Sequence, residues 1–338
     1  MTAVSRRRRD IINGFSAVRV AVAGDLIADE FIYGQIDRVS REAPVLILRY
    51  DSAEVLPGGA GNAARNAASL GASVQLVGMV GRDPAGRGLI KALEATADVS
   101  GVVQASNYVT PVKTRILAGG VHSAKQQVVR IDRAGGGLTP TAQRRVEKSL
   151  VKALGQSDAL VISDYGGGLM SPETWQRAMA SAGSSTPRVV VVDSRYDLGR
   201  FTGITACTPN ESEVEALLGV RIDDNRRVLE DAGRELLQRL NCQAVLITRG
   251  SRGMALFEQG RPTDHISIVG SDQVTDVTGA GDTVIATFAV ALAAGATFGE
   301  AARLANYAGG IVVMKRGTAV VTRNELVAAA GGAAERTS

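Results

Sequence analysis

The chain of 338 residues contains little cysteine and histidine, and this scarcity excludes a common class of metal site. Its two cysteines, Cys207 and Cys242, form no Cys-x-x-Cys pair, and its two histidines, His122 and His265, lie far apart. A zinc centre needs clusters of these ligands at short spacings, so none is expected. A reducing cytoplasm is the simplest location for such a chain.

Long apolar runs are also absent. The most apolar stretch, residues 284–296, is too short to cross a bilayer, so no membrane partner is expected. The net charge is +4, and the arginine run at residues 6–9 accounts for four positive charges. No apolar segment of a signal peptide follows that run.

The arginine run could contact nucleic acid or anionic lipid, but aromatic residues are not interleaved with it and no similar basic cluster follows. We therefore predict no nucleic-acid partner. Residues 1–17 are expected to form a disordered basic tail, residues 18–330 a single domain, and residues 331–338 a second tail.

Two nucleotide-binding motifs are missing as well. No Gly-x-x-x-x-Gly-Lys-Ser/Thr sequence occurs, which excludes a P-loop NTPase, and the glycines of residues 81–88 lack the dinucleotide-binding spacing. Aromatic residues make up only 4% of the chain, whereas glycine is abundant at 39 residues. Hydrophobic content of 45% with 21% charged residues is typical of a soluble globular protein rich in tight turns.

Short apolar runs alternate with helical patterns along most of the chain. Buried strands are predicted at residues 18–23, 74–77, 159–162, 189–192 and 244–247, and helices at residues 61–70, 141–154, 172–182, 211–218 and 226–240. Such alternation predicts a mostly parallel sheet covered on both faces. Ligands of these sheets collect at the carboxyl ends of the strands, where polar residues follow each run.

Two segments depart from this rhythm. Residues 31–54 and 111–132 show strand-like alternation with no helix between their strands, so both are predicted to be antiparallel. We interpret them as a small β-sheet that projects from the body as a lid.

The most informative motif is Asp-Val-Thr-Gly-Ala-Gly-Asp at residues 276–282, followed by an apolar run typical of a long helix. Glycines let backbone N–H groups approach an anion, and a helix N-terminus adds a favourable dipole. Asp282 would lie beside the anion, placed to accept a proton from an attacking hydroxyl. A Gly-rich turn that only caps a core helix is the plain structural alternative.

Earlier segments offer ligands for a polar substrate. Asp25 and Asp29 follow the first strand, where carboxylates bind sugar hydroxyls but also form ordinary turns. A Gly-Gly turn at Gly58 and Gly59 precedes Asn62, which could bind a hydroxyl or cap a helix.

Later segments offer ligands for a nucleotide. Asn210 and Glu213 lie at a loop-to-helix junction, where one carboxylate suffices for a hydrated Mg²⁺, although acidic residues are common in a helix's first turn. Residues 248–253 follow another strand and could place cationic and backbone donors beside phosphates or form a plain turn.

In this order, the motifs resemble those of the ribokinase-like, or PfkB, family of carbohydrate kinases, over residues 18–326. The resemblance implies a three-layer α/β/α sandwich with a mostly parallel central sheet and a small β-sheet lid. It implies ATP and Mg²⁺, leaves a monovalent cation open, and favours a homodimer formed through the lid. It makes Asp282 the catalytic base, Gly279, Ala280 and Gly281 the anion hole, and Glu213 a ligand of Mg²⁺ through water.

The resemblance also assigns the two substrates. The ATP-binding residues are predicted to be Asn210, Glu211, Ser212, Glu213, Thr248, Arg249, Gly250, Gly253, Thr278 and Asn306. The acceptor-binding residues are predicted to be Asp25, Asp29, Gly58, Gly59, Asn62, Lys113, Arg115 and Arg195.

Further segments, at residues 38–44, 113–115, 126–132, 163–165 and 314–318, are similar to those of heptose 7-phosphate kinases. That subfamily usually shows Ser-Asp-Tyr-x-Lys-Gly and Asp-Pro-Lys, where this chain has Gly167 in place of the first lysine and Asp193-Ser194-Arg195 for the second motif. Many members carry a nucleotidyltransferase domain with a His-x-Gly-His motif, which this sequence lacks.

The expected activity is ATP-dependent phosphorylation of O1 of D-glycero-D-manno-heptose 7-phosphate. Lys113 and Arg115 would share one face of a lid strand and, with Arg195, meet the distal phosphate. One alternative is a kinase of another small sugar or nucleoside, and a second is a non-catalytic sugar- or nucleotide-binding protein on the same fold.

Overall fold

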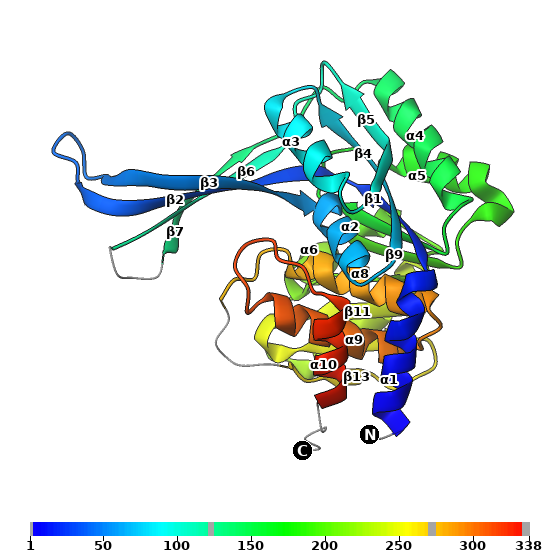
Figure 1. The fold of residues 1–338 in the computed structure, drawn as a ribbon. Helices are drawn as coiled ribbons and strands as arrows, with labels where there is room; N and C mark the ends of the chain where they lie inside the picture. The colour runs from blue at the N-terminus through cyan, green and yellow to red at the C-terminus, as the bar shows by residue number, and fades with distance from the viewer. Residues whose placement is uncertain (1–2, 121–124, 270–274, 333–338) are drawn as a thin grey trace.

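A nine-stranded sheet runs through the body of the protein in the order β13-β12-β11-β10-β9-β8-β1-β4-β5 (Figure 1). The computed structural model describes residues 3–120, 125–269 and 275–332. Neighbouring strands from β5 across to β11 are parallel, and β12 and β13 are antiparallel additions at one edge. The strands are β1 Arg19–Gly24, β4 Ser73–Gly81, β5 Asp98–Ala105, β8 Ala159–Asp164, β9 Val189–Ser194, β10 Ala206–Cys207, β11 Ala244–Thr248, β12 Met254–Glu258 and β13 Asp264–Ile266.

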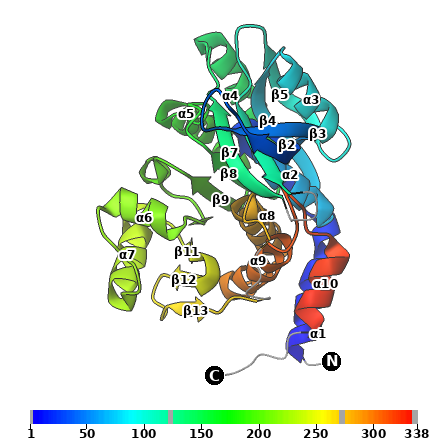
Figure 2. The ribbon, with the colours of Figure 1, turned by 90° about the vertical axis from the view of Figure 1, so that its left-hand side faces the viewer.

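Helices cover both faces of this sheet, because its strands are apolar on both sides. In β1, Val20 and Val22 pack into one core, and Ala21 and Ala23 pack into the other. The helices on the Val20 side are α1 Ala3–Gly14, α2 Ala60–Ser69, α3 Pro84–Leu93, α8 Ala280–Ala293, α9 Phe298–Val312 and α10 Arg323–Gly332. Those on the Ala21 side are α4 Pro140–Leu154, α5 Pro172–Ala182, α6 Glu211–Leu218 and α7 Arg226–Arg239 (Figure 2).

The predicted α/β/α sandwich is confirmed, and each strand and helix predicted for the body is present. Local sequence explains where helices begin: Thr139 precedes Pro140 and Ser171 precedes Pro172, and both hydroxyls accept an N–H of the first turn. Among the helices of the described residues, none is long and apolar enough to cross a membrane.

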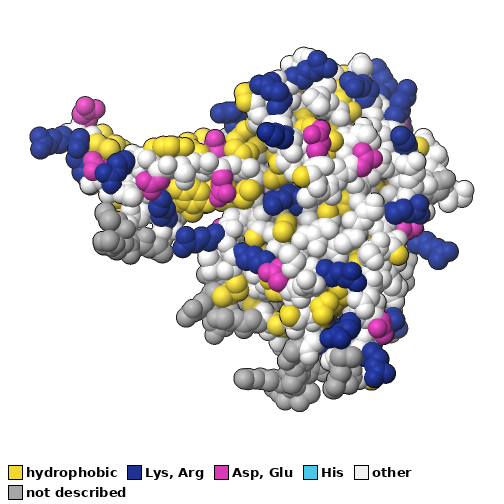
Figure 3. All heavy atoms as spheres, viewed as in Figure 1, with side chains coloured by type: hydrophobic (Ala, Val, Ile, Leu, Met, Phe, Trp, Pro, Cys, Tyr) yellow, Lys and Arg dark blue, Asp and Glu magenta, His cyan; other side chains and the backbone are white. Residues whose placement is uncertain are grey.

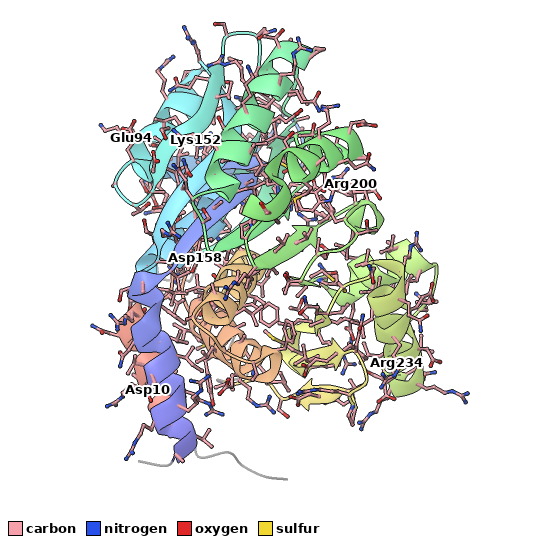
Figure 4. All side chains as sticks on the ribbon, turned by 90° about the vertical axis from the view of Figure 1, so that its right-hand side faces the viewer. Asp10, Glu94, Lys152, Asp158, Arg200 and Arg234 are labelled. Atoms are coloured by element: carbon pink, nitrogen blue, oxygen red, sulfur yellow. The ribbon has the colours of Figure 1, made fainter. Side chains whose placement is uncertain are left out.

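The N-terminal segment is ordered, so the prediction of a disordered tail over residues 1–17 is wrong for residues 3–17. Ile11, Ile12 and Phe15 are almost completely buried, and α1 packs against α10 (Figure 4). Two arginines of the run are anchored: Arg7 Nε lies 3.1 Å from Glu300 Oε1, and Arg8 Nη1 donates to Tyr307 Oη (3.1 Å). Arg8 therefore lies on the buried face of α1 with Ile11 and Ile12, whereas the other three arginines of the run are exposed. The second tail, predicted from residue 331, lies outside the described residues beyond residue 332, where α10 ends.

A second sheet, with strand order β3-β2-β6-β7, projects from the body as a long arm (Figure 1). Its strands are β2 Leu26–Val39, β3 Leu46–Gly59, β6 Val112–Gly119 and β7 Gln126–Arg133. The predicted lid segments fall on these strands and on the turn between β2 and β3, and residues 121–124 lie outside the described residues. Each hairpin is antiparallel as predicted, and a parallel pairing of β2 with β6 joins the two.

Candidate active site

A cavity of about 400 Å³ lies where the root of the lid meets the carboxyl ends of the central strands. Parallel α/β sheets bind ligands at this edge. The cavity is lined by Asp29, Gly59, Lys113, Arg115, Arg130, Asp164, Tyr165, Asp193, Arg195, Thr208, Asn210, Glu213, Thr248, Val277, Thr278, Gly279, Gly281 and Asp282. Half of the residues predicted for the two substrates are thus brought together here from separate parts of the chain.

The turn before α8 presents backbone donors to this cavity. Gly279 adopts φ 77°, a left-handed conformation that favours glycine, and a Cβ at this position would overlap Asn62 Nδ2. Ala280 N–H donates to Val277 O (3.2 Å), so this N–H already has an acceptor within the turn. The N–H groups of Gly279, Gly281 and Asp282 have no acceptor among the described residues. They leave three donors at a helix N-terminus, a favourable place for an anion.

Asp282 lies in the first turn of α8 and is only 2% exposed. Asn62 Nδ2 donates to its Oδ2 (3.0 Å), and Tyr165 Oη donates to its Oδ1 (3.1 Å). Burial raises the pKa of this carboxyl to about 7, although both hydrogen bonds oppose the rise. A carboxylate with a pKa near neutrality is suited to act as a general base.

The residues predicted to bind the acceptor differ in whether they already have a partner within the protein. Asp29 Oδ1 lies 2.6 Å from Arg115 Nη1, and both side chains are buried, so Arg115 is already paired. Gly58 leaves room for that carboxylate, because a Cβ there would overlap Asp29 Oδ2. Asp25 does not line this cavity: its Oδ2 accepts the N–H groups of Tyr165 (2.8 Å) and Gly167 (3.0 Å), which fixes the loop after β8.

A basic region extends the cavity beyond Tyr165. An adjoining cavity of about 440 Å³ shares Lys113, Arg130, Tyr165 and Arg195 with the first. Lys113 Nζ lies 4.5 Å from the centre of the Tyr165 ring, and Arg195 Cζ lies 5.6 Å from it. Burial lowers the pKa of Lys113, as expected for an ammonium group with too few counter-charges.

Asn210 and Glu213 form a capping box at the start of α6. Asn210 Oδ1 accepts Glu213 N–H (2.9 Å), and Glu213 Oε2 accepts Asn210 N–H (2.9 Å). The helix-cap alternative is therefore realised, yet both residues also line the cavity.

A second carboxylate faces the same space as Glu213. The pKa of Asp193 is raised well above its ordinary value, first by burial and then by the charges of Glu213 and Asp282. Thr208 Oγ1 is buried beside them with no hydrogen-bond partner among the described residues. Two carboxylates are a suitable anchor for a hydrated Mg²⁺, and the described residues hold no cluster of three or more His, Cys, Asp or Glu ligands.

The segment after β11 separates two further cavities. Arg249 Nε lies 2.6 Å from Glu211 Oε1, and Arg252 pairs with both Glu211 and Asp224, so two carboxylates balance the two arginines. With Asn210 and Ser212, the predicted residues Arg249 and Gly250 line an open cavity of about 550 Å³.

An apolar cavity of about 190 Å³ lies between β11 and the helices α8 and α9. Gly250, Gly253, Ala280 and Asn306 line it. Asn306 Nδ2 donates to Ser267 O (2.7 Å), so its amide has an internal partner. This cavity adjoins the first through Thr248, Val277 and Gly281 and has the apolar walls that a flat base requires.

Tyr165, Asp193 and Arg130 are the site residues that the sequence-based assignment missed. Tyr165 and Asp193 directly follow buried apolar runs, and that position at the carboxyl edge of the sheet was the available signal. Arg130 shares the lid strand β7 with Asp132, whose carboxylate it contacts through two hydrogen bonds of 2.8 and 2.6 Å.

Comparisons with known proteins agree with this geometry. The model of the pfkB family carbohydrate kinases matches residues 21–324. The bifunctional protein HldE of Caulobacter vibrioides is 40% identical over 323 residues, which cover 94% of this chain and 65% of that protein. The HldE of Klebsiella pneumoniae subsp. pneumoniae is 40% identical over 325 residues, covering 95% of this chain and 65% of its own length. The chain thus spans about two thirds of these relatives.

Solved structures share the fold. Ribokinase of Arabidopsis thaliana, complexed with ribose and ATP, superposes with a TM-score of 0.72 at 20% identity, covering 93% of this chain and 98% of that one. Phosphofructokinase-2 of Escherichia coli, in complex with substrates and products, gives a TM-score of 0.74 at 20% identity with the same coverage. Another structure of that enzyme is in complex with potassium.

Proposed function

Because this chain belongs to the pfkB family of carbohydrate kinases and is an ATP-dependent carbohydrate kinase, we propose that its acceptor is a sugar phosphate, D-glycero-D-manno-heptose 7-phosphate, phosphorylated at O1. Motif resemblance to heptose 7-phosphate kinases supports this choice. The main structural support is the basic cavity beyond Tyr165.

In the proposed reaction, the acceptor hydroxyl lies against Asp282. Asp282 takes the hydroxyl proton as the new O–P bond forms, and the bond between the γ-phosphorus and the bridging oxygen breaks, releasing ADP. The N–H groups of Gly279, Gly281 and Asp282 stabilise the charge on the transferring phosphoryl group. Asn62 and Tyr165 orient the carboxylate so that its remaining lone pairs face the cavity.

ATP is proposed to extend from the α8 turn across Thr248 to the apolar cavity that Gly253 and Asn306 line. Glu213 and Asp193 would hold Mg²⁺, Glu213 through water, and the ion would neutralise phosphate charge when bound. Because Glu211 is paired with Arg249 and Arg252, we assign these three side chains to shaping the nucleotide cavity rather than to phosphate binding. A potassium titration decides whether a monovalent cation is needed.

The basic cavity favours an acceptor with an anionic far end. A hydroxyl at Asp282 places the rest of the acceptor toward Lys113, Arg130 and Arg195, which line both connected cavities. Arg115 cannot serve in the same way, because Asp29 neutralises it in a buried pair, whereas the pair of Arg130 with Asp132 is half exposed and can open to a phosphate. Asp25 and Asp132 also line the second cavity, but its four cations outnumber them, so a neutral sugar would leave a net positive charge unmatched.

The test compares kcat/KM for heptose 7-phosphate with the values for ribose, fructose and adenosine. Arg130→Ala is expected to raise KM for the heptose phosphate about tenfold or more, because a charge-assisted hydrogen bond contributes about 1.5–3 kcal/mol. KM for ATP stays unchanged, and Arg145→Ala, at an exposed site on α4, is the matched control. Faster turnover of an unphosphorylated sugar would overturn the proposed acceptor.

We further propose a homodimer formed through the lid. Several large apolar side chains of the lid are exposed, and Figure 3 shows hydrophobic groups gathered along the arm. They include Val39, Val45, Leu46, Tyr50, Val129 and Ile131. A second copy of the chain would cover them. Light scattering should give the dimer mass, and Ile131→Glu should shift it toward the monomer. A cytoplasmic location, where ATP is available, completes the proposal and suits the two free cysteines.

A further inference from the structure

Tyr165 lines both connected cavities. It contacts the catalytic carboxylate of the first cavity and two cations that line both. It follows β8, and the loop that carries it is fixed by Asp25, which accepts the N–H groups of Tyr165 and Gly167. Its hydroxyl donates to Asp282 Oδ1 (3.1 Å), while Lys113 and Arg195 lie over its ring at 4.5 and 5.6 Å. One side chain therefore meets the catalytic carboxylate at its polar end and two cations at its aromatic surface.

We propose that Tyr165 is a positioning residue with two separable functions: its hydroxyl orients the Asp282 carboxylate, and its ring holds Lys113 and Arg195 in place for the anionic end of the acceptor. The inference rests on the proposed function, since it needs a kinase whose acceptor carries an anionic group.

The hydroxyl function follows from the hydrogen bonds of Asp282. Each carboxylate oxygen accepts one hydrogen bond from the protein, Oδ2 from Asn62 and Oδ1 from Tyr165. These two donors, on opposite oxygens, prevent rotation of the carboxylate and leave one accepting direction on each oxygen for the acceptor hydroxyl. Without the phenol, Oδ1 loses the one donor that it has among the described residues, and the carboxylate is free to turn about its Cβ–Cγ bond.

The ring function follows from the position of the two cations. Lys113 comes from the lid strand β6 and Arg195 from the loop after β9, so no element of secondary structure holds them side by side. Their positive charges repel each other. The attraction of each cation to the electron-rich face of the Tyr165 ring offsets part of this repulsion. Phenylalanine preserves this ring, whereas leucine is a smaller apolar side chain with no aromatic face.

Several charged groups face Asp282, and the pH test must account for them. Asp29 on β2 raises the pKa of Asp282, and Lys113 on β6 lowers it. Asp193 at the end of β9 is close enough to be influenced by the charge of Asp282. The hydrogen bond from Tyr165 lowers the pKa of Asp282, so its removal should shift the acidic limb of kcat/KM upward by about one pH unit.

The experiment compares the wild type with Tyr165→Phe and Tyr165→Leu, using ATP and heptose 7-phosphate. In Tyr165→Phe, kcat/KM is expected to fall about tenfold near pH 6 and about twofold near pH 8, with KM for the heptose phosphate within about twofold of wild type at the higher pH. In Tyr165→Leu, the same pH shift is joined by a rise of about fivefold or more in that KM. The phosphate of the acceptor titrates near pH 6 in every variant, so it cancels when variants are compared at one pH.

Tyr307→Phe is the control for removal of a buried phenol, because Tyr307 lies on α9 against α1, outside both cavities. A Tyr165→Phe enzyme with the wild-type acidic limb would overturn the hydroxyl function. Equal KM values for Tyr165→Phe and Tyr165→Leu would overturn the ring function. If the wild type fails to use heptose 7-phosphate but phosphorylates another sugar, the proposed acceptor fails instead, and the pH comparison is repeated on that sugar.

Discussion

Asp282→Asn should abolish most activity and at the same time stabilise the protein. The loss of a general base typically lowers kcat about 10²–10⁴-fold. The stability gain arises because the folded protein raises the pKa of Asp282 from its ordinary value of 3.8 to about 7. Between these pH values the unfolded chain has lost this proton and the folded chain keeps it, so the stability of the wild type falls as pH rises. About three pH units correspond to about 4 kcal/mol at pH 8.

The amide can replace the carboxylate without leaving an unpaired group. Its oxygen accepts from Asn62 Nδ2, and its NH₂ donates to Tyr165 Oη, whose hydroxyl can accept as well as donate. Urea unfolding of the wild type and the variant at pH 5, 6, 7 and 8 measures the difference, and ADP release measures kcat. Asp10→Asn is the control, because Asp10 is exposed on α1 (Figure 4). A stability difference that does not grow between pH 5 and 8 would refute the reasoning, as would a wild-type kcat.

Three further substitutions test other parts of the structure. Glu213→Gln keeps an oxygen for the Asn210 cap but removes charge, so the Mg²⁺ concentration for half-maximal activity should rise several-fold while α6 stays folded; an unchanged Mg²⁺ dependence would leave Glu213 as a cap alone. Gly279→Ala should lower kcat at least about tenfold, because φ 77° disfavours alanine by about 1–2 kcal/mol and the new Cβ displaces Asn62 from Asp282; a wild-type kcat would contradict this. Ile12→Ala should destabilise the protein by about 2–5 kcal/mol in urea unfolding without changing kcat, and a loss under about 0.5 kcal/mol would argue against the packing of α1.

The parts of the fold that the sequence predicts are those that depend on local pattern. Runs such as residues 159–162 and 189–192 are apolar on both sides because both faces of the sheet are covered, and they became β8 and β9. The turn before Asp282 was also predicted locally, because glycines followed by an apolar run indicate the start of a helix, and α8 begins there. The prediction of a disordered N-terminal tail failed because it used the local charge density of the arginine run alone. The apolar side chains of α1 are buried by packing against α10, which lies at the other end of the chain.

What the sequence could not predict depends on register between distant strands. The parallel pairing of β2 with β6 places Asp29 opposite Lys113 and beside Arg115, which converts an expected phosphate ligand into half of a buried ion pair. Asp25 and Asp29 are chemically equivalent in the sequence, yet Asp25 fixes the loop at Tyr165 beside the second cavity, and Asp29 pairs with Arg115 in the first. Only the three-dimensional arrangement distinguishes them.

The contact between α1 and α10 has a consequence for the chain during its synthesis. Arg323 Nη2 donates to Asn13 Oδ1 (2.9 Å) across 310 residues of sequence. Ribosomes add about 5–20 residues per second, so α1 leaves the ribosome about 15–60 s before α10 is complete. A helix forms within about a microsecond, and for that whole interval Ile11, Ile12 and Phe15 lack their final neighbour. The positive charges of the four preceding arginines would oppose association of these exposed apolar side chains with other nascent chains.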